Sequence, residues 1–230
     1  MDRTAILVDG GFYRKRALAL FGRKSPSARA TELTRYCQRH VKDNPGGKDS
    51  LYRIFYYDCP PPQKKYYDPI RKTTVDFEQQ DSFRWAKEFH RELASKRKVA
   101  IRMGELSERH SGYTIEPDTL KKLIGGRIGL ADIQPCDLKL IGVTQKGVDM
   151  RIGLDIASLS SKGLVSQIIL ISGDSDFVPA AKHARREGID FILDPMWHHI
   201  NDELNLHIDG LKSRVHKPPR NTEDPLHTSL

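Results

Sequence analysis

The chain has 230 residues, of which 38% are hydrophobic, and it carries a formal net charge of +8 at pH 7. This length suits one α/β domain with insertions, and the hydrophobic content is enough to bury a sizeable core. No apolar run approaches the ~18 residues that a membrane span needs, so we expect no membrane-spanning segment. The positive charge favours a polyanionic partner such as nucleic acid, although an ordinary basic surface explains it equally well.

The three cysteines, Cys37, Cys59 and Cys136, are far apart and odd in number. They have neither disulfide nor zinc-site spacing, which is typical of a reducing compartment. The first residues lead directly into an apolar segment, so we expect no secretory signal peptide. These features together predict a cytoplasmic protein.

Apolar, β-branched segments alternate along the chain with segments of helical periodicity. Strands that alternate with helices predict an α/β fold with a mostly parallel sheet and helices on both faces. The pattern predicts strands at residues 4–9, 51–57, 99–106, 138–144, 168–171 and 189–193, and helices at residues 12–21, 27–41, 76–95, 148–161, 178–187 and 201–211.

Four other stretches lack a clear periodicity. Residues 44–47 are predicted to form a turn, and the polar residues 63–74 a loop or a short irregular helix. Residues 107–135 are predicted to be an insertion or a β-hairpin with a mobile tip, with a short helix near its middle. The basic tail at residues 213–230 has too little apolar content to order itself. The predicted domain therefore covers residues 1–212, with the insertion inside it.

Acidic residues stand where predicted strands end or helices begin. Asp9 ends the first strand, Asp174 and Asp176 follow the buried strand at residues 168–171, and Asp149 lies in the first turn of a helix. In open parallel sheets, ligands bind at the edge outside the carboxyl ends of the strands. Oxygen ligands suit Mg²⁺ or Mn²⁺, and a cation relieves the repulsion between carboxylates. The hypothesis that follows is a divalent metal held by these four side chains.

Each acidic residue also has a purely structural explanation. Asp9 before two glycines suits a turn, and Asp176 suits the cap of the helix that carries Pro179 in its first turn. Asp149 is favoured at a helix N-terminus whatever its role. Asp155 falls on the apolar stripe of its helix, where an unpaired carboxylate is costly. We expect Asp155 to support the site from behind by accepting hydrogen bonds from a loop backbone, and ligation of the metal is the alternative.

Basic and hydroxyl side chains near these motifs are candidates to bind substrate. For each basic residue, an ordinary exposed helix charge is the competing explanation. For each serine, the alternatives are contact with a phosphate, orientation of a carboxylate or stabilisation of the turn. The candidates are Arg14, Lys15, Lys146, Arg151, Ser172 and Ser175.

Four tyrosines are candidates to stack on unpaired bases. They are Tyr56, Tyr57, Tyr66 and Tyr67. Because neighbouring residues of a strand point to opposite faces, either Tyr56 or Tyr57 must face the core.

Three motifs follow one another along the chain. They are Val8-Asp9-Gly10-Gly11-Phe12, then Lys146-Gly147-Val148-Asp149 with Asp155 behind it, then Ser172-Gly173-Asp174-Ser175-Asp176-Phe177. Together they resemble the NYN domain, in the LabA-like branch of the PIN-like nucleases, over roughly residues 4–211. The resemblance implies a Rossmann-like (PIN-like) sheet, a carboxylate cluster and metal-dependent cleavage of RNA.

By this resemblance, Asp9, Asp149 and Asp174 would be catalytic ligands of Mg²⁺ or Mn²⁺, and Asp176 would be a further ligand or would bind through water. The implied activity is an endoribonuclease that hydrolyses phosphodiester bonds of single-stranded or structured RNA. Many relatives carry Asn at the position of Gly11. This departure leaves open a non-catalytic RNA-binding or regulatory protein with the same fold. A homodimer is one assembly that the sequence allows.

Two further classes fit the sequence less well. A haloacid-dehalogenase-type phosphatase has a last acidic motif similar to Gly173-Asp174, but its nucleophilic Asp needs a second Asp two residues later, where Gly11 stands. A nucleotide-binding Rossmann protein needs a Gly-x-Gly-x-x-Gly motif after the first strand, and the chain has none there.

Overall fold

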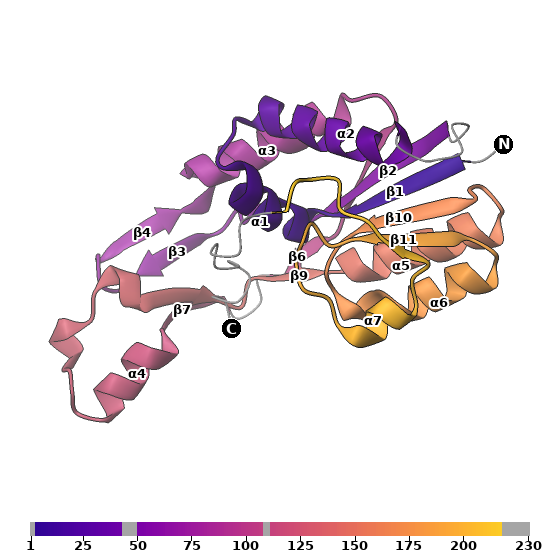
Figure 1. Cartoon of the computed structure of the whole chain (residues 1–230). Coiled ribbons are helices and arrows are strands. Elements are labelled where there is room, and N and C mark those ends of the chain that lie inside the picture. Colours follow the sequence, from indigo (N-terminus) through magenta and orange to yellow (C-terminus); the bar gives the residue numbers. More distant parts are fainter. Residues whose placement is uncertain (1–2, 43–49, 108–110, 218–230) are drawn as a thin grey trace.

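Six parallel strands form the central sheet, in the order β12-β11-β10-β1-β2-β5 (Figure 1). The computed structural model describes residues 3–42, 50–107 and 111–217. The predicted α/β class with a parallel sheet is therefore confirmed. The strands are β1 (Arg3–Asp9), β2 (Ser50–Asp58), β5 (Val99–Met103), β10 (Gln167–Ile171), β11 (Asp190–Asp194) and β12 (Gly210–Leu211).

The strand β1 lies at the centre of the sheet, between β10 and β2. Val8 pairs with Ile171 of β10, and Asp9 pairs with Tyr57 of β2. The carboxyl ends of these three strands therefore meet at one edge of the sheet, which is the edge where parallel sheets bind ligands. The chain segments that leave β1 and β10 at this edge carry the predicted acidic motifs.

Helices cover both faces of the sheet. Alternate residues of each strand point to opposite faces, so Leu7 and Leu170 contribute to one buried cluster while Ile6 and Ile169 contribute to the other. One face is covered by α1 (Gly10–Phe21), α2 (Pro26–Lys42) and α3 (Asp81–Ala94), and the other by α5 (Val148–Ser161) and α6 (Val178–Arg186).

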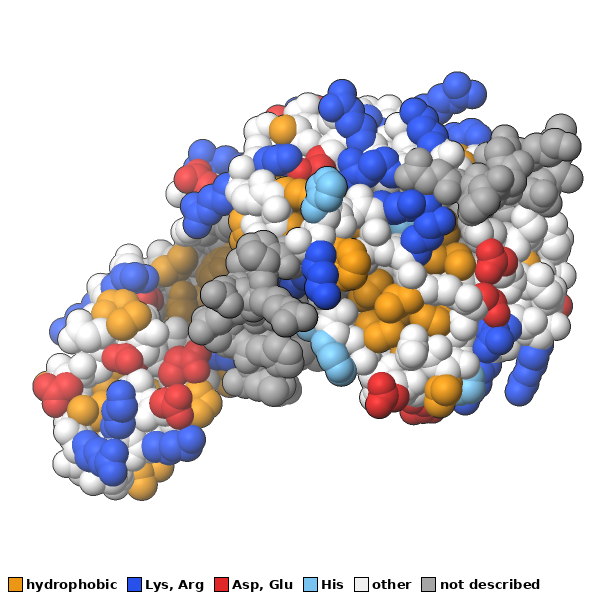
Figure 2. All heavy atoms as spheres, viewed as in Figure 1, with side chains coloured by type: hydrophobic (Ala, Val, Ile, Leu, Met, Phe, Trp, Pro, Cys, Tyr) orange, Lys and Arg blue, Asp and Glu red, His pale blue; other side chains and the backbone are white. Residues whose placement is uncertain are grey.

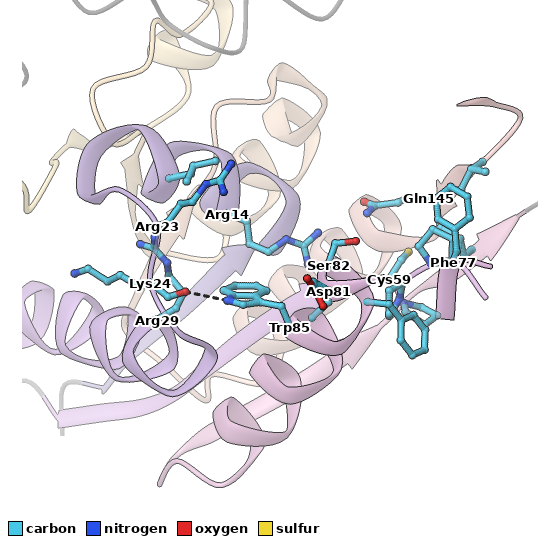
Figure 3. Close-up of a pocket in the computed structure, with 18 residues that line it drawn as sticks. Arg14, Arg23, Lys24, Arg29, Cys59, Phe77, Asp81, Ser82, Trp85 and Gln145 are labelled. Atoms are coloured by element: carbon cyan, nitrogen blue, oxygen red, sulfur yellow. Dashed lines mark hydrogen bonds between the residues drawn. The ribbon is translucent and has the colours of Figure 1, made fainter. Parts of the chain in front are cut away.

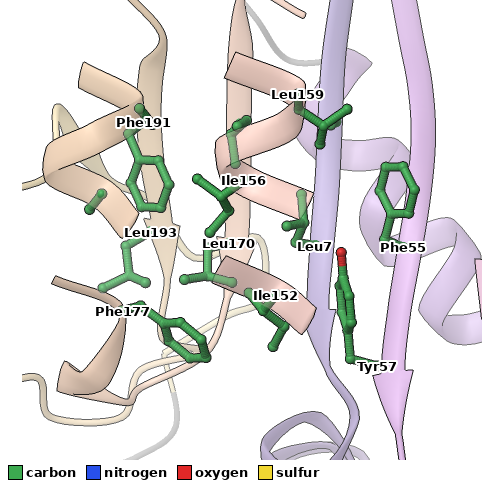
Figure 4. Packing of buried hydrophobic residues seen from close by; sticks show 14 of the residues in the cluster. Leu7, Phe55, Tyr57, Ile152, Ile156, Leu159, Leu170, Phe177, Phe191 and Leu193 are labelled. Atoms are coloured by element: carbon green, nitrogen blue, oxygen red, sulfur yellow. The ribbon is translucent and has the colours of Figure 1, made fainter. Parts of the chain in front are cut away.

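The helix α5 packs through the stripe that its sequence predicts. Val148, Ile152, Ile156 and Leu159 are all buried in the same cluster as Leu170 (Figure 4). This packing fixes the helix against β1 and β10. Its first turn therefore has a defined position at the carboxyl edge of the sheet.

The polar segment 63–74 is not a loop, and this prediction was wrong. It contributes to an antiparallel pair, β3 (Lys65–Asp68) and β4 (Thr73–Asp76). The ring of Tyr66 packs edge-on against Phe77, with 5.3 Å between ring centroids, which anchors the pair to the domain. The helix predicted at residues 76–95 also divides into a short 3-10 helix, η1 (Phe77–Gln79), and α3.

The region predicted as an insertion forms a projecting arm (Figure 1). The strand predicted at residues 99–106 is divided at Gly104 into β5 and β6 (Glu105–Ser107), and only glycine fits there, because a Cβ would lie 2.6 Å from the backbone oxygen of Lys146. The strand predicted at residues 138–144 lies in the arm and not in the central sheet. The elements of the arm are β6 paired with β9 (Thr144–Lys146), β7 (Gly112–Ile115) paired with β8 (Leu138–Ile141), α4 (Pro117–Ile124), η2 (Leu130–Asp132) and η3 (Pro135–Asp137).

The helix predicted at residues 201–211 is too long. The structure has α7 (Asp202–Leu206), followed by the short strand β12. Asp209 draws the chain back to the sheet, because its backbone N–H donates to the carbonyl of Phe191 at 2.8 Å and its carboxylate accepts from the Phe191 N–H at 2.9 Å.

The beginning of the predicted tail makes defined contacts. The hydroxyl of Ser213 donates to Asp194 at 2.8 Å, and the indole N–H of Trp197 donates to the carbonyl of Val215 at 2.7 Å. The remainder of that tail, and the turn predicted at residues 44–47, lie outside the described residues. No helix in the described part of the chain is long and apolar enough to cross a membrane.

Candidate active site

Asp9 stands at the centre of the carboxyl edge, between the end of β1 and the start of α1. Its Oδ1 accepts a hydrogen bond from the backbone N–H of Phe12 at 3.1 Å, which makes Asp9 the N-cap of α1. Its Oδ2 accepts from the hydroxyl of Ser172 at 3.4 Å. Burial raises the pKa of Asp9 to about 6, and the charges of Asp149 and Asp174 contribute to the increase.

Asp149 and Asp174 lie close enough to Asp9 to act on its charge, Asp176 acts on Asp149, and all three are exposed. Burial, and then the charges of Asp174 and Asp176, raise the pKa of Asp149. Each of the four predicted acids therefore acts electrostatically on at least one other. The sheet edge brings together residues that are far apart in the sequence, and it concentrates negative charge there.

In the side-chain positions of this structure, the acids do not converge on one point. Among the residues described, no three His, Cys, Asp or Glu side chains are close enough together to hold a metal ion as they stand. The donors are nonetheless of the type that Mg²⁺ and Mn²⁺ prefer, because the predicted set consists of carboxylates only. The side chains of Asp149, Asp174 and Asp176 are exposed at this edge, so solvent or an ion can reach all three carboxylates.

The cap of the segment after β10 is Asp174, and the expectation that Asp176 caps a helix was wrong. Asp174 accepts from the backbone N–H of Asp176 at 3.0 Å and caps the short 3-10 helix η4 (Ser175–Phe177). The following helix α6 has Phe177 at its N-cap position and no side-chain cap. Within the described part of the chain, neither carboxylate oxygen of Asp176 accepts a hydrogen bond, so both are available at this edge.

Ser172 links Asp9 to Asp174. Its side chain is completely buried, and its hydroxyl donates to Asp9 and accepts from the backbone N–H of Asp174 at 3.3 Å. Among the roles considered for Ser172, the contacts are those of a residue that orients a carboxylate. Ser175 is half-buried within η4.

Asp58, which ends β2, is a residue of this edge that the sequence did not single out. It is fully buried, and its Oδ2 accepts from His90 at 2.9 Å and from the hydroxyl of Tyr56 at 3.1 Å, and it also forms an ion pair with Arg14. Burial alone would raise the pKa of Asp58, but the hydrogen bond from His90 and the charge of Arg14 lower it overall. The signal available in the sequence was an Asp at the end of a predicted strand, as at Asp9.

This ion pair excludes the competing explanation for Arg14, an ordinary exposed helix charge. Its guanidinium is held by Asp58 and keeps 28% of its side chain exposed, so Arg14 is a positioned cation and not an ordinary surface charge. Lys15, Lys146 and Arg151 are also near the edge, and Lys146 and Arg151 are exposed.

The carboxylate of Asp155 contacts side chains of β2 and β5. It accepts from the hydroxyl of Tyr57 at 2.7 Å and from Nε of Arg102 at 3.1 Å. The partners are therefore two side chains and not the loop backbone that we expected. The side chain of Asp155 is paired with Arg102 and supports β2 and β5 next to the site.

Of the four tyrosines predicted to stack on bases, only Tyr67 is exposed, at 60%. Tyr56 and Tyr57 are both fully buried, because helices cover each face of the sheet, and Tyr66 is buried by β4 and η1. The stacking role is therefore excluded for these three.

A cavity of about 350 Å³ opens beside Asp9 and Asp149, and Gly11 lies in its wall. A Cβ on Gly11 would lie 3.5 Å from Oδ1 of Asp9 and 3.7 Å from the side-chain oxygen of Gln145, which are ordinary contacts. Space for a side chain therefore exists at Gly11, and the amide of Gln145, at the base of the arm, approaches Asp9 from this direction.

Basic side chains are numerous on one side of the domain. On the face in Figure 2, Lys and Arg gather over the side that carries α2 and α3, whereas the arm carries charges of both signs. Such a distribution favours association with a polyanion.

The NYN domain model matches residues 58–205, which is more than half of the chain. The chain therefore belongs to the NYN domain family, whose members are generally ribonuclease-like nucleases. Asp149, Asp174 and Asp176 lie within the matched residues, and Asp9 precedes them.

The crystal structure of a protein of unknown function from Vibrio parahaemolyticus is similar over 91% of this chain and 91% of that one, with 14% sequence identity and a TM-score of 0.44. None of the curated proteins compared matches the chain.

Proposed function

We propose that this protein is a metal-dependent endoribonuclease of the LabA-like branch, acting at Asp9, Asp149, Asp174 and Asp176. The observation that carries the proposal is the coupling of these acids at the carboxyl edge of the sheet. Asp9 has a pKa of about 6, raised by burial and by the charges of Asp149 and Asp174. Carboxylates whose pKa values are raised by burial and by one another cluster at functional sites.

Asp9, Asp149 and Asp174 would hold Mg²⁺ or Mn²⁺, and Asp176 would bind it directly or through water. When bound, the cation would neutralise charge that develops on the phosphoryl group and would activate the attacking water. The chain itself supplies orientation, because Ser172 and the Phe12 N–H fix the carboxylate of Asp9.

Arg14 would bind a non-bridging oxygen of the RNA phosphate. Its partner Asp58 is buried and fixes the guanidinium at the edge of the cavity beside Asp9. A preorganised cation of this kind stabilises charge in the transition state without a further ordering cost. Lys15, in the wall of the same cavity, would add a contact to the RNA backbone, as would the nearby Lys146 and Arg151.

The proposal includes the cellular location of the protein. A cytoplasmic location is supported by the absence of any disulfide among Cys37, Cys59 and Cys136, which are all free thiols. The second candidate function is RNA binding without cleavage, and the observation that favours it is that the acids do not converge in their present side-chain positions.

Cleavage of end-labelled RNA separates the two functions. Wild-type protein is incubated with single-stranded and hairpin RNA in Mg²⁺, Mn²⁺ or EDTA, beside Asp9→Asn and Asp174→Asn. Asp118→Asn is the matched control, because Asp118 is 87% exposed and lies in α4 of the arm, outside the segments that carry the four acids. We expect cleavage only with metal, lost in the first two variants and kept in the control. RNA binding with no metal-dependent cleavage would establish the non-catalytic function instead.

A further inference from the structure

A second and larger cavity, of about 810 Å³, lies next to the acidic edge. This volume is within the range of about 300–1,000 Å³ that is typical of small-molecule sites. Its walls come from the end of α1, the start of α2, the start of α3, the loop after β2 and the base of the arm (Figure 3). No residue of the proposed acidic set lines it.

Aromatic side chains form one wall of this cavity. They are Phe77, Phe83 and Trp85, which come from η1 and α3. Trp85 is held in place, because its ring stacks on Phe89 with centroids 5.1 Å apart and its indole N–H donates to the carbonyl of Lys24 at 2.9 Å. One face of this ring is thus covered by Phe89, while the side chain lines the cavity. A rigid half-exposed indole of this kind is a stacking surface.

The charges around the aromatic wall are mainly positive. Four basic residues and one acidic residue line the cavity: Arg14, Arg23, Lys24, Arg29 and Asp81. Arg29 and Lys24 pair with Glu32, whereas Arg23 is exposed and makes no ion pair with any residue that the structure describes. A cavity that combines aromatic rings with surplus cations matches a base together with its phosphate.

The two cavities are neighbours. Arg14 and Gln145 line both the cavity beside Asp9 and the aromatic cavity. Arg14, fixed by Asp58, therefore stands at the junction between the acids and the aromatic wall. A strand whose phosphate lies at the acids would pass Arg14 and reach Phe83 and Trp85 with a neighbouring base.

We propose that the aromatic cavity binds an unpaired base of the RNA strand, next to the phosphodiester that lies at the acidic edge. The proposal rests on the proposed nuclease function and defines its substrate class as single-stranded RNA. A base in a duplex is stacked and paired, so it cannot enter the cavity without leaving its helix. Phe83 and Trp85 would stack on the base, and Arg23 would contact the adjoining phosphate.

Fluorescence of Trp85 tests this proposal directly. Trp85 and Trp197 are the only tryptophans in the chain, so Trp197→Phe leaves Trp85 as the single reporter. In the 230-residue chain with Trp197→Phe and Asp174→Asn, in EDTA to prevent cleavage, we titrate a uridine oligonucleotide, a hairpin duplex of equal charge, inorganic polyphosphate and uridine monophosphate. We expect the oligonucleotide to quench Trp85, and the duplex and polyphosphate to bind without quenching.

Variants locate the base. Phe83→Ala should raise the dissociation constant for the oligonucleotide roughly 5- to 100-fold, the range for loss of one stacked aromatic side chain, while Phe83→Tyr should preserve it. Arg23→Gln should reduce the salt dependence of binding by about one phosphate contact. Leu206→Ala is the control, because Leu206 is 73% exposed and lies outside the cavity.

The outcomes distinguish this proposal from the nuclease function. Oligonucleotide binding without quenching, equal quenching by polyphosphate, or equal losses in Phe83→Ala and Leu206→Ala would overturn base binding in the cavity, even if wild-type protein cleaves RNA. Binding of uridine monophosphate as tight as that of the oligonucleotide would instead indicate a site for free nucleotides. Quenching of the Asp174→Asn protein by the single strand, together with wild-type protein that cleaves no RNA in Mg²⁺ or Mn²⁺, would refute the nuclease and leave the base site intact.

Discussion

Replacing Asp9 by Asn should make the protein more stable and, if Asp9 is a catalytic ligand, inactive. Burial raises the pKa of Asp9 from 3.8 to about 6. A tenfold change in proton affinity corresponds to about 1.4 kcal/mol, so this difference costs the folded state up to about 3 kcal/mol when Asp9 is ionised. An Asn keeps an oxygen to accept from the Phe12 N–H but carries no charge.

The sign of the pH dependence follows from the raised pKa. Below pH 3.8, Asp9 is protonated in both the folded and the unfolded chain, so it imposes no electrostatic cost. As the pH rises through about 6, the unfolded chain has already lost its proton and the folded chain is forced to ionise, so the stability contributed by this group is lost. The stabilising effect of Asp9→Asn should therefore be largest at pH 7.5 and should disappear below pH 4.

Urea denaturation in EDTA at several pH values measures this difference, with Asp118→Asn as the exposed control. Adding Mg²⁺ or Mn²⁺ should stabilise wild-type protein, by about 2.7 kcal/mol at one hundred times the dissociation constant, and should stabilise Asp9→Asn much less. A variant that is no more stable at pH 7.5, or whose gain does not depend on pH, would refute the reasoning about burial. Equal stabilisation of both proteins by metal would refute ligation by Asp9.

Two further predictions concern the packing behind the site. Gly10→Ala should destabilise the fold by about 1–3 kcal/mol, because its Cβ would lie 2.5 Å from the carbonyl oxygen of Tyr57. Gly11→Ala should be neutral or should stabilise the fold by up to about 1 kcal/mol, because its Cβ meets only ordinary contacts and the residue lies in a helix. Denaturation midpoints of the pair check this, and equal effects would contradict it. Asp194→Ala should cost about 3–5 kcal/mol, because Asp194 is fully buried and accepts from His40 at 2.7 Å. A loss below about 1 kcal/mol in urea denaturation would show that this buried network contributes little.

The sequence predicts the sheet and the acidic edge because both depend on local patterns. The buried strand before Asp174 is an apolar run in which Ile168, Ile169 and Ile171 are β-branched, and α5 has a regular apolar stripe from Val148 to Leu159. Once parallel strands are assumed, their carboxyl ends must share an edge, so Asp9 and Asp174 come together without knowledge of any contact.

Features that depend on contacts between distant segments were not predictable. The pair β3–β4 is largely polar in sequence, so its strands show no apolar alternation, and it is held by the contact of Tyr66 with Phe77. The ion pair of Arg14 with Asp58 joins a helix to a strand end 44 residues away. The aromatic cavity likewise needs α3 to pack beside the loop after β2, which no periodicity encodes.

The contact of Gln145 beside Gly11, the position where the resemblance leads us to expect Asn, was also not predictable from the sequence. The sequence shows Gly11 and therefore a missing amide, but only the structure shows the amide of Gln145 next to that glycine. The arm that carries Gln145 is the region in which the sequence pattern was least clear. The position of Gln145 next to Gly11 depends on how the arm packs in the folded chain.

The central claim is that the acids at the carboxyl edge hold a divalent metal that is needed to cleave RNA. Asp149 tests it most directly, because it is exposed at the start of α5 and its replacement by Asn removes a charge without opening the core. We predict that the single-turnover cleavage rate of labelled single-stranded RNA in Mn²⁺ falls by about two to three orders of magnitude in Asp149→Asn, in line with the loss of one electrostatic contact to the transition state, and is unchanged in Asp118→Asn. Cleavage by Asp149→Asn at the wild-type rate, or wild-type cleavage that persists in EDTA, would contradict the account.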